Sequence, residues 1–201
     1  MSSHTSGVRY AEVERETTET HVRVVLDLDG GTKRDVATGI GFLDHMLQLL
    51  AFHGEFDLGV SAEGDLYIDD HHTVEDIGIV LGQAMRQAIA AHEQIQRYGS
   101  NLTPMDESLI QCAVDISGRG QYHGDLPFTR DRIGDLSTES IPEFFRAFAR
   151  HACITLHLRK LAGSNDHHVC EAAFKALGRA LHQATRKSER RGSASTKGVM
   201  D

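Results

Sequence analysis

The sequence predicts an α+β fold made of two similar halves, each with the order β-β-β-α-β-α, with the helices packed together behind the sheets. Three observations support this prediction: a duplicated segment, alternating apolar residues before each copy, and helical periodicity within each copy. The segments 70–88 and 166–184 align without gaps and share nine of nineteen residues, including the head Asp-His-His-x-x-Glu. We therefore expect a single domain over 1–201, with halves at about 8–94 and 95–188.

The elements of the first half follow from its hydrophobic pattern. Apolar residues alternate with polar ones in the strands and recur every three to four residues in the helices. This pattern predicts strands near 8–16, 20–28, 33–38 and 55–62, and helices near 42–53 and 71–93. Asp29, Gly30 and Gly31 predict a hairpin turn between the second and third strands. Asp70 stands where it can cap the long helix.

The second half repeats this order. It predicts strands near 97–106, 108–116, 120–126 and 154–160, and helices near 141–152 and 167–187. Asp166 takes the capping place at the start of the last helix. A polar arm (1–7) precedes the first half, and a tail (188–201) rich in Ser, Arg and Gly follows the second.

The composition restricts the class of protein. Of 201 residues, 40% are hydrophobic and 25% are charged, and the formal net charge is −8. This charge disfavours general binding to nucleic acid or to anionic membranes. No stretch approaches the ~20 apolar residues that cross a bilayer, and the N-terminus lacks the apolar run of a signal peptide. Three cysteines without paired spacing predict reduced thiols, so we expect a cytoplasmic protein.

Histidine is the unusual residue, with 13 copies. In a helix, residues i and i+4 project from the same face. His71 and Glu75 can therefore bind one metal ion, and so can His167 and Glu171. Paired histidines at a helix start are usually polar surface residues, but the duplication of the whole motif favours metal ligands.

The remaining candidate ligands extend this interpretation. The second histidine of each copy, His72 or His168, points about a quarter-turn away, toward a different ion or another subunit. This geometry predicts two sites with shared ligands. His45 lies where a turn leads into the first short helix, and Glu143 holds the matching place in the second half. Taken alone, His45 is equally consistent with a core histidine.

Six segments together identify a family. They are 41–47 (GFLDHML), 70–76 (DHHTVED), 104–107 (PMDE), 165–172 (NDHHVCEA), 174–180 (FKALGRA) and 195–198 (STKG). In this order they resemble the hallmarks of the imidazoleglycerol-phosphate dehydratases, and the resemblance covers nearly the whole chain from Arg9 to Met200. Some relatives carry a phosphatase domain before the dehydratase. Because few residues precede the first strand here, we expect the monofunctional form.

The resemblance implies a hydro-lyase of histidine biosynthesis that converts imidazole glycerol phosphate to imidazole acetol phosphate. It implies a fold similar to domain 2 of ribosomal protein S5, a cofactor of two Mn²⁺ ions per active site, and a small phosphorylated substrate. It also implies a homo-oligomer of twenty-four chains with active sites between subunits. Many members have His where this chain has Glu143, but a carboxylate is also a reasonable manganese ligand.

The resemblance, together with the motif geometry, gives roles to individual residues. The predicted metal ligands are His45, His71, His72, Glu75, Glu143, His167, His168 and Glu171. The predicted catalytic residues are Glu19, His45, His71 and Glu171, with Glu19 moving the proton. The predicted contacts to the substrate, chiefly to its phosphate, are Glu19, Arg97, Arg119, Ser195, Thr196 and Lys197.

The chemistry of the substrate suggests a mechanism. The hydrogen to be removed has no neighbouring carbonyl to acidify it, so the imidazole ring of the substrate must relay the electrons. Metal ions on both ring nitrogens would favour the imidazolate. The ring can then expel the hydroxyl to give a diazafulvene, which makes the neighbouring C–H acidic. No organic cofactor is required.

Other functions stay open on the sequence alone. A non-catalytic protein that joins subunits through metal ions explains the duplicated motif but leaves Glu19, Arg97 and Arg119 without a role. A ferritin-type di-iron protein uses Glu-x-x-His, in the reverse order and at a different spacing. A zinc hydrolase of the common type needs His-Glu-x-x-His, which the sequence lacks.

Overall fold

The computed structural model of the chain describes residues 8–90 and 94–188. Its helices are α1 (Gly41–Gly54), α2 (His71–Ala90), α3 (Ser140–His151) and α4 (Asp166–Thr185). Its strands are β1 (Tyr10–Glu16), β2 (Thr20–Asp27), β3 (Arg34–Ala37), β4 (Asp57–Gly64), β5 (Tyr98–Met105), β6 (Ser108–Asp115), β7 (Gln121–Asp125), β8 (Arg132–Ile133), β9 (Leu136–Ser137) and β10 (Thr155–Ala162). Every predicted helix and strand is present, and the short strands β8 and β9 were not predicted.

Each half forms a sheet with the same connectivity. The strand order is β1-β2-β4-β3 in the first sheet and β5-β6-β10-β7 in the second. In each sheet the first three strands of this order are antiparallel, and the last strand joins its neighbour in parallel. The predicted α+β class with duplicated halves is therefore confirmed.

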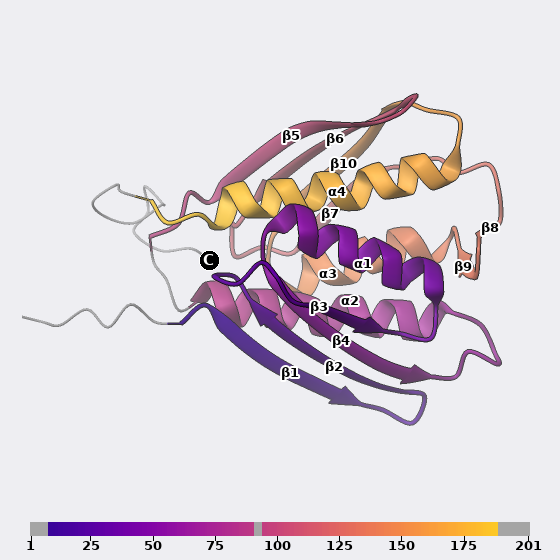
Figure 1. The fold of residues 1–201 in the computed structure, drawn as a ribbon, viewed down its shortest axis with the longest axis horizontal. Coiled ribbons are helices and arrows are strands. Elements are labelled where there is room, and N and C mark those ends of the chain that lie inside the picture. Colours follow the sequence, from indigo (N-terminus) through magenta and orange to yellow (C-terminus); the bar gives the residue numbers. More distant parts are fainter. Residues whose placement is uncertain (1–7, 91–93, 189–201) are drawn as a thin grey trace, which may run out of the picture.

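The helices lie between the two sheets (Figure 1). The long helices cover the sheets, α2 against β1 and β2, and α4 against β5 and β6. The short helices cross between the halves, so that α1 packs against α4 and α3 packs against α2. The apolar stripes of the helices and the inner faces of both sheets are thus buried in one continuous core.

Two glycines of the duplicated segment permit this crossing. A β-carbon on Gly178 would lie 2.5 Å from the backbone oxygen of Leu50 in α1. A β-carbon on Gly82 would lie 2.7 Å from the backbone oxygen of Phe148 in α3. These separations are too short for real atoms, so any larger residue would push the helices apart. The glycines shared by the two copies therefore allow the halves to approach each other closely.

The turn at 29–31 does not form the predicted hairpin. β4 lies between β2 and β3, antiparallel to the first and parallel to the second. The connection is held instead by Asp57, whose Oδ1 accepts hydrogen bonds from the backbone N–H groups of Gly31, Thr32 and Lys33 at 2.7, 2.7 and 2.8 Å. The pairing was predicted wrongly because turn residues indicate a reversal of the chain but do not identify the partner strand.

The capping of the long helices also differs from the prediction. The first histidine of each motif donates its backbone N–H to the residue two positions earlier, Asp69 in one copy (2.9 Å) and Asn165 in the other (3.0 Å). Asp70 and Asp166 were predicted as caps, and that prediction is wrong. Both are buried, and their carboxylates turn toward the segment 129–140, which contains β8 and β9.

The motif aspartates tie this segment to the long helices. Asp70 accepts hydrogen bonds from the backbone N–H of Ser137 and from the hydroxyl of Ser140, the latter at 3.1 Å. Asp166 accepts hydrogen bonds from the two successive N–H groups at 129–130, both at 2.8 Å. A buried carboxylate needs such donors, so each motif aspartate has a structural role.

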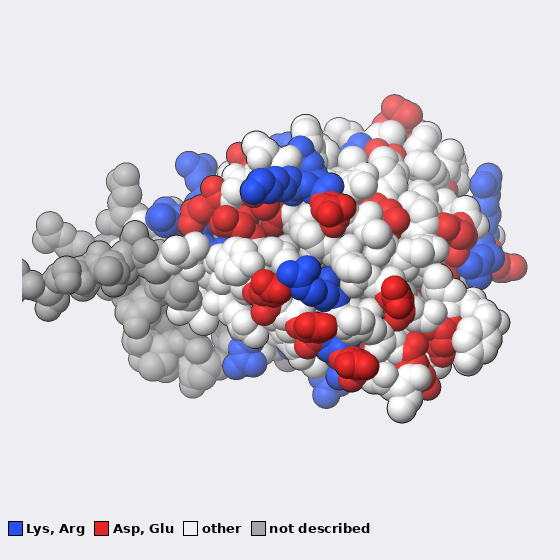
Figure 2. Space-filling view, turned by 60° about the horizontal axis from the view of Figure 1, so that its bottom comes forward, with Lys and Arg blue, Asp and Glu red and all other residues white. Residues whose placement is uncertain are grey.

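The outer face of the first sheet is polar. Its strands carry exposed ion pairs such as Arg23–Glu12 (2.6 Å) and His21–Glu14 (2.5 Å). Figure 2, which turns this side toward the viewer, shows acidic and basic side chains interspersed, with no continuous basic stripe among the described residues. Within 8–90 and 94–188, no helix combines the length and the apolar character needed to cross a membrane.

Replacing Asp57 with Asn tests how the 29–31 turn is held. The backbone N–H groups, that of Lys33 foremost, keep the pKa of the Asp57 carboxyl below its ordinary value. The ionised form therefore stabilises the folded chain. At pH 7 we expect D57N to lose about 1–2 kcal/mol of unfolding free energy, measured by urea unfolding.

The pH dependence of this loss follows from the lowered pKa. The stabilisation is fully present above the unfolded-state pKa of about 4 and disappears as the pH falls through the folded-state pKa. The difference between D57N and the unaltered chain should therefore shrink below about pH 4. A difference that stays constant down to acid pH would show that the charge of Asp57 does not hold the turn.

Candidate metal and substrate site

All four described helices begin at the same end of the molecule, at the right in Figure 1. We call it the motif end, because both copies of the duplicated motif open there. The loops β1–β2 and β5–β6 and the β8–β9 hairpin lie at this end too. Every predicted metal ligand stands in the first two turns of a helix, so the fold brings all of them to the motif end.

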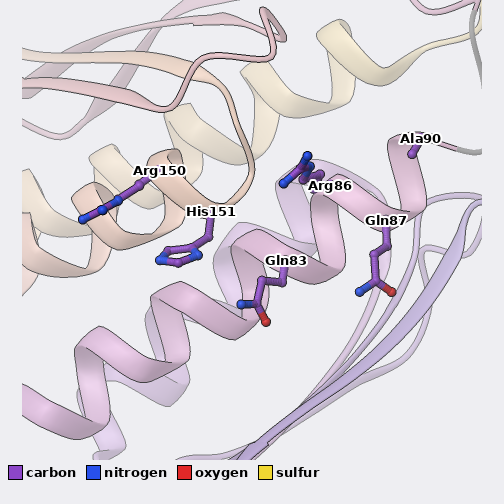
Figure 3. A pocket seen from close by; sticks show the side chains of 6 residues that line it. All are labelled: Gln83, Arg86, Gln87, Ala90, Arg150 and His151. Atoms are coloured by element: carbon purple, nitrogen blue, oxygen red, sulfur yellow. The ribbon is translucent and has the colours of Figure 1, made fainter. Parts of the chain in front are cut away.

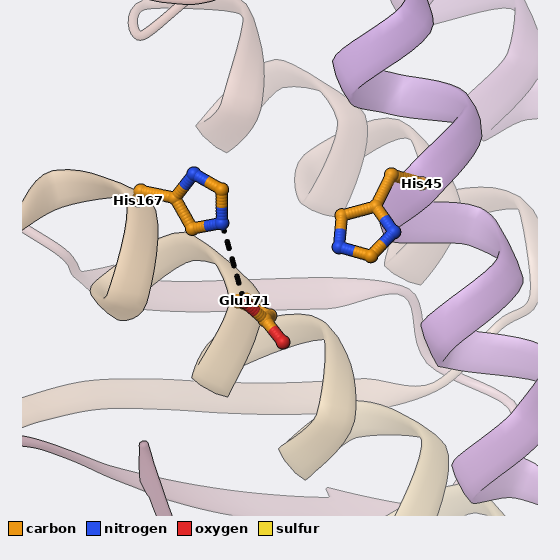
Figure 4. Close-up of side chains that lie close together, drawn as sticks. All are labelled: His45, His167 and Glu171. Atoms are coloured by element: carbon orange, nitrogen blue, oxygen red, sulfur yellow. Dashed lines mark ion pairs between the residues drawn. The ribbon is translucent and has the colours of Figure 1, made fainter. Parts of the chain in front are cut away.

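His45, His167 and Glu171 lie together between α1 and α4 and form what we call the α1–α4 cluster (Figure 4). Nε2 of His167 is 3.3 Å from Oε2 of Glu171, and the ring centroids of His45 and His167 are 6.4 Å apart. One possible ligand atom from each residue lies within 4.8 Å of the others. Two imidazoles and one carboxylate suit manganese, iron or zinc, so these residues fit a divalent metal ion.

The Glu171 carboxylate is held ionised although its side chain is only 10% exposed. Burial acts to raise its pKa, but the Lys175 ammonium, 2.6 Å from Oε1, and the nearby His167 lower the pKa below its ordinary value. Because a metal ion binds the ionised carboxylate, Lys175 keeps Glu171 in the form that can act as a ligand.

A second cluster contains Glu19, Asp65 and His72. Nδ1 of His72 is 2.9 Å from Oδ2 of Asp65 and 3.7 Å from Oε2 of Glu19. The hydrogen bond to Asp65 raises the pKa of His72 above its ordinary value. The other oxygen, Oδ1 of Asp65, is buried and has no hydrogen-bond partner among the described residues.

Asp65 was missed in the sequence, whereas Glu19 and His72 were predicted as site residues. Asp65 lies in the loop between β4 and α2, which is longer than the matching loop in the second half. The comparison of the two halves could therefore not reveal it.

The second half has a matching arrangement around His168. Its Nδ1 is 2.7 Å from Oε2 of Glu107, and its Nε2 is 3.7 Å from Oδ2 of Asp106. The hydrogen bond with His168 lowers the pKa of Glu107 to about 2. Glu107 directly precedes β6 as Glu19 directly precedes β2. No role was predicted for Glu107 from the sequence, although its equivalence to Glu19 in the first half could have indicated one.

The other predicted ligands are less closely gathered. Nε2 of His71 is 4.0 Å from Oε2 of Glu75. Glu143 lies near the start of α3, but its carboxylate pairs with Arg146 about one turn further along. Among the described residues, Glu143 does not join His71 and Glu75 in a group comparable to the α1–α4 cluster.

The predicted phosphate contacts Arg97 and Arg119 lie at the end of the molecule opposite the motif end. The backbone N–H of Arg97 donates to the carbonyl of Ala184 at the end of α4 (2.9 Å). At about 1.5 Å per residue, this point lies about 25 Å from His167 along the helix. The Arg97 side chain also pairs with Asp115 (2.7 Å). Ser195, Thr196 and Lys197 lie outside the described residues, so their role stays a prediction.

A hollow of about 480 Å³ lies where α2 and α3 end (Figure 3). It is lined by Gln83, Arg86, Gln87, Ala90, Arg150 and His151. None of these is a predicted site residue, and none is acidic. Gly120, which follows Arg119, packs against the backbone of Arg150. Arg97, Arg119 and the arginines of this hollow therefore lie at one end of the fold, which we call the arginine end, while the predicted metal ligands lie at the motif end.

The sequence matches that of a known family. The sequence profile of the family described as Imidazoleglycerol-phosphate dehydratase matches residues 38–181. An imidazoleglycerol-phosphate dehydratase of Desulforamulus reducens is 55% identical over 193 residues, which are 96% of this chain and 98% of that protein. The enzyme of the same name from Acetivibrio thermocellus is 53% identical over 193 residues, which are 96% and 99% of the two chains.

Solved structures agree in fold as well as in sequence. The imidazoleglycerol-phosphate dehydratase of Staphylococcus aureus superimposes with a TM-score of 0.81 at 37% identity, covering 89% of this chain and 99% of that one. The dehydratase of Pyrococcus furiosus, solved in complex with (S)-C348, gives a TM-score of 0.82 at 40% identity and covers 93% and 99% of the two chains.

Proposed function

The chain belongs to the imidazoleglycerol-phosphate dehydratase family, and on that premise we propose how its own residues carry out the reaction. Members of this family are hydro-lyases that remove water from imidazole glycerol phosphate in histidine biosynthesis. The substrate is therefore a small phosphorylated molecule. The single observation that carries the proposal is the α1–α4 cluster, in which the two halves of the duplicated chain each contribute metal-binding side chains to one place.

We assign the metal ions to the motif end. His45, His167 and Glu171 would hold one manganese ion, because two imidazoles and an ionised carboxylate are a fitting donor set. Oδ1 of Asp65, which is buried and has no hydrogen-bond partner within 8–90 and 94–188, supports a cation near His72 as well. The remaining predicted ligands, His71, Glu75, Glu143 and His168, would complete two manganese ions per active site together with neighbouring copies of the chain.

The bound ions would hold the substrate imidazole and would favour its deprotonated form, the imidazolate. The electron-rich ring would then expel the hydroxyl, which would leave as water with the proton released from the ring nitrogen, and the resulting diazafulvene would make the neighbouring C–H acidic. Glu19 is the carboxylate proposed to take that proton. Its loop is held by Thr17, whose hydroxyl accepts the Glu19 N–H at 3.1 Å, and its carboxylate lies beside His72.

The separation of the two ends favours an active site between copies of the chain. The substrate carries only three carbons between its imidazole and its phosphate, which is far shorter than the ~25 Å between the start and the end of α4. One chain therefore cannot offer both its α1–α4 cluster and its Arg97 or Arg119 to the same substrate molecule. We propose a homo-oligomer, with twenty-four chains as in the family, in which one copy binds the imidazole and another binds the phosphate.

The whole chain is proposed to act as one dehydratase domain of two repeats, with the tail 188–201 completing the phosphate site. A metal-joined scaffold without activity, a ferritin-type iron protein and a zinc hydrolase were the alternatives. Membership of a dehydratase family disfavours all three.

Chelation is the direct test of this proposal. Purified protein, stripped of metal and supplied with imidazole glycerol phosphate, should form imidazole acetol phosphate at a rate at least about 100-fold below that of the manganese-loaded protein. Adding Mn²⁺ should restore the rate. Full activity in the stripped protein would refute a role for metal.

A pair of histidine variants locates the metal. H45Q should weaken Mn²⁺ binding, measured by electron paramagnetic resonance of the free ion, by more than about 10-fold. H157Q makes the same change at an exposed position of β10 on the outer face of the second sheet, and it should bind Mn²⁺ as the unaltered chain does. Equal binding by both variants would remove His45 from the site.

Glu19 is tested by its amide variant. At saturating Mn²⁺, E19Q should lower kcat by about 100-fold or more, because the proton acceptor is lost. E16Q, at the exposed end of β1 in the same region, is the matched control and should keep the normal kcat. Near-normal turnover by E19Q would exclude Glu19 as the acid–base residue.

Mixed oligomers test the position of the active site. H167Q alters the motif end and R119A alters the arginine end, so each variant alone should be inactive. When the two are co-expressed in equal amounts, roughly a quarter of the sites should combine an unaltered motif end with an unaltered Arg119, and activity should return to that level. Mixed oligomers as inactive as the single variants would place the whole site within one chain.

A further inference from the structure

Helix α1 carries His45 but has no cap from its own sequence. The residue in the capping position, Ile40, has an apolar side chain and makes no side-chain cap hydrogen bond. The first N–H groups of a helix have no partner inside the helix. Two of them, from Gly41 and Phe42, donate to the two carboxylate oxygens of Asp135, at 2.6 and 2.9 Å. A residue of the second half therefore caps a helix of the first half.

The position of Asp135 is fixed by the hairpin that carries it. Asp135 and Gly134 form the turn between β8 and β9, and Gly134 has a φ of +61°, which glycine adopts without strain. Leu136 is fully buried beside the turn. The next N–H, that of Ser137, donates to the motif aspartate Asp70 at the start of α2. The hairpin is thus bonded to the start of the long helix α2 as well as to the start of α1.

The same segment is also anchored to α4. Asp166, at the start of α4, accepts the N–H groups at 129–130, just before β8. The segment 129–140 therefore touches the starts of α1, α2 and α4 through carboxylates, and α3 begins at its last residue, Ser140. Helices from both halves are held in register at the motif end by this one short segment.

The hydrogen bonds of Asp135 lead directly to the α1–α4 cluster. Phe42, whose N–H Asp135 accepts, places its ring edge-on to the ring of His167, with centroids 5.1 Å apart and planes inclined at 61°. His45 follows Phe42 by about one helical turn, and so lies on the same side of α1. A shift of the start of α1 would move both the Phe42 ring and His45 relative to His167 and Glu171.

We propose that Asp135 is a positioning residue for the metal ligands of the α1–α4 cluster. Its carboxylate fixes the start of α1 and thereby sets the distance from His45 to the ligands on α4. Asp135 would act through the N–H groups of Gly41 and Phe42, and it is not among the residues of the α1–α4 cluster. The inference rests on the proposed function, because it concerns the metal that the cluster would hold.

The D135N variant isolates this role. Asparagine keeps the shape of the side chain but offers one acceptor oxygen, and it turns an N–H₂ group toward one of the two helix N–H groups. Loss of a group that orients metal ligands commonly lowers metal affinity by about 10–100-fold. Asp131 is exposed and lies in the same segment, so D131N removes the same charge without disturbing the cap of α1.

The experiment titrates the metal-free proteins with Mn²⁺ and measures binding by electron paramagnetic resonance. D135N should raise the Kd for Mn²⁺ about 10-fold or more, while D131N stays within about twofold of the unaltered chain. At saturating Mn²⁺ the KM of D135N for the substrate should stay within about twofold, because the phosphate contacts lie at the other end. A loss of thermal stability in D135N with unchanged Mn²⁺ affinity would overturn the proposal.

Two further variants separate the possible failures. If H45Q binds Mn²⁺ as tightly as the unaltered chain, the proposed metal site itself is wrong, and with it the role of Asp135. If H45Q loses affinity and D135N does not, the metal site stands and only the positioning role is refuted. Should D135N fail to fold, D135E keeps both oxygens one methylene further out and should give an intermediate loss of affinity.

Discussion

The close crossing of α1 over α4 is the contact on which the rest of the site depends. Gly178 leaves room for the backbone of α1 where any other residue would not fit. Glu171 stands two turns before Gly178 on the same face of α4, so the face that meets α1 also presents the carboxylate to His45. Gly82 and Glu75 repeat this spacing on α2, against α3. In each copy of the duplicated segment, the glycine thus allows the short helix to approach closely. The glutamate two turns earlier faces that same short helix.

This arrangement gives the folded molecule two chemically different ends, the motif end and the arginine end. Both copies of the motif open their helices at the same end, where histidines and carboxylates gather. Arg97, Arg119 and the basic hollow beside Arg150 lie where helices finish, about one helix length away. A duplicated fold with this polarity is suited to assembly, because the motif end of one copy can meet the arginine end of another. The activity of the family and the proposed oligomer are therefore linked through the geometry of a single chain.

The duplication explains how much could be predicted from the sequence. Matching segments predicted the fold class, the helices and strands of both halves, and the i,i+4 pairs that the helices bring together. Features without a copy were missed: Asp65 lies in a loop that differs between the halves, and β8 and β9 are too short for an alternating pattern. The cap of α1 by Asp135 joins residues 94 and 93 positions apart, a separation that no local pattern records. Glu143 was predicted by equivalence, but its pairing with Arg146 depends on its own helix.

Diffraction from crystals of the manganese-loaded protein, recorded on either side of the manganese absorption edge, would locate the ions directly. We expect one ion bonded to His45, His167 and Glu171 of a single chain, with Arg119 of a second copy facing the same site. Ions bound away from these three side chains would contradict the proposed metal centre. A site whose arginine and histidines come from the same chain would contradict the proposed assembly.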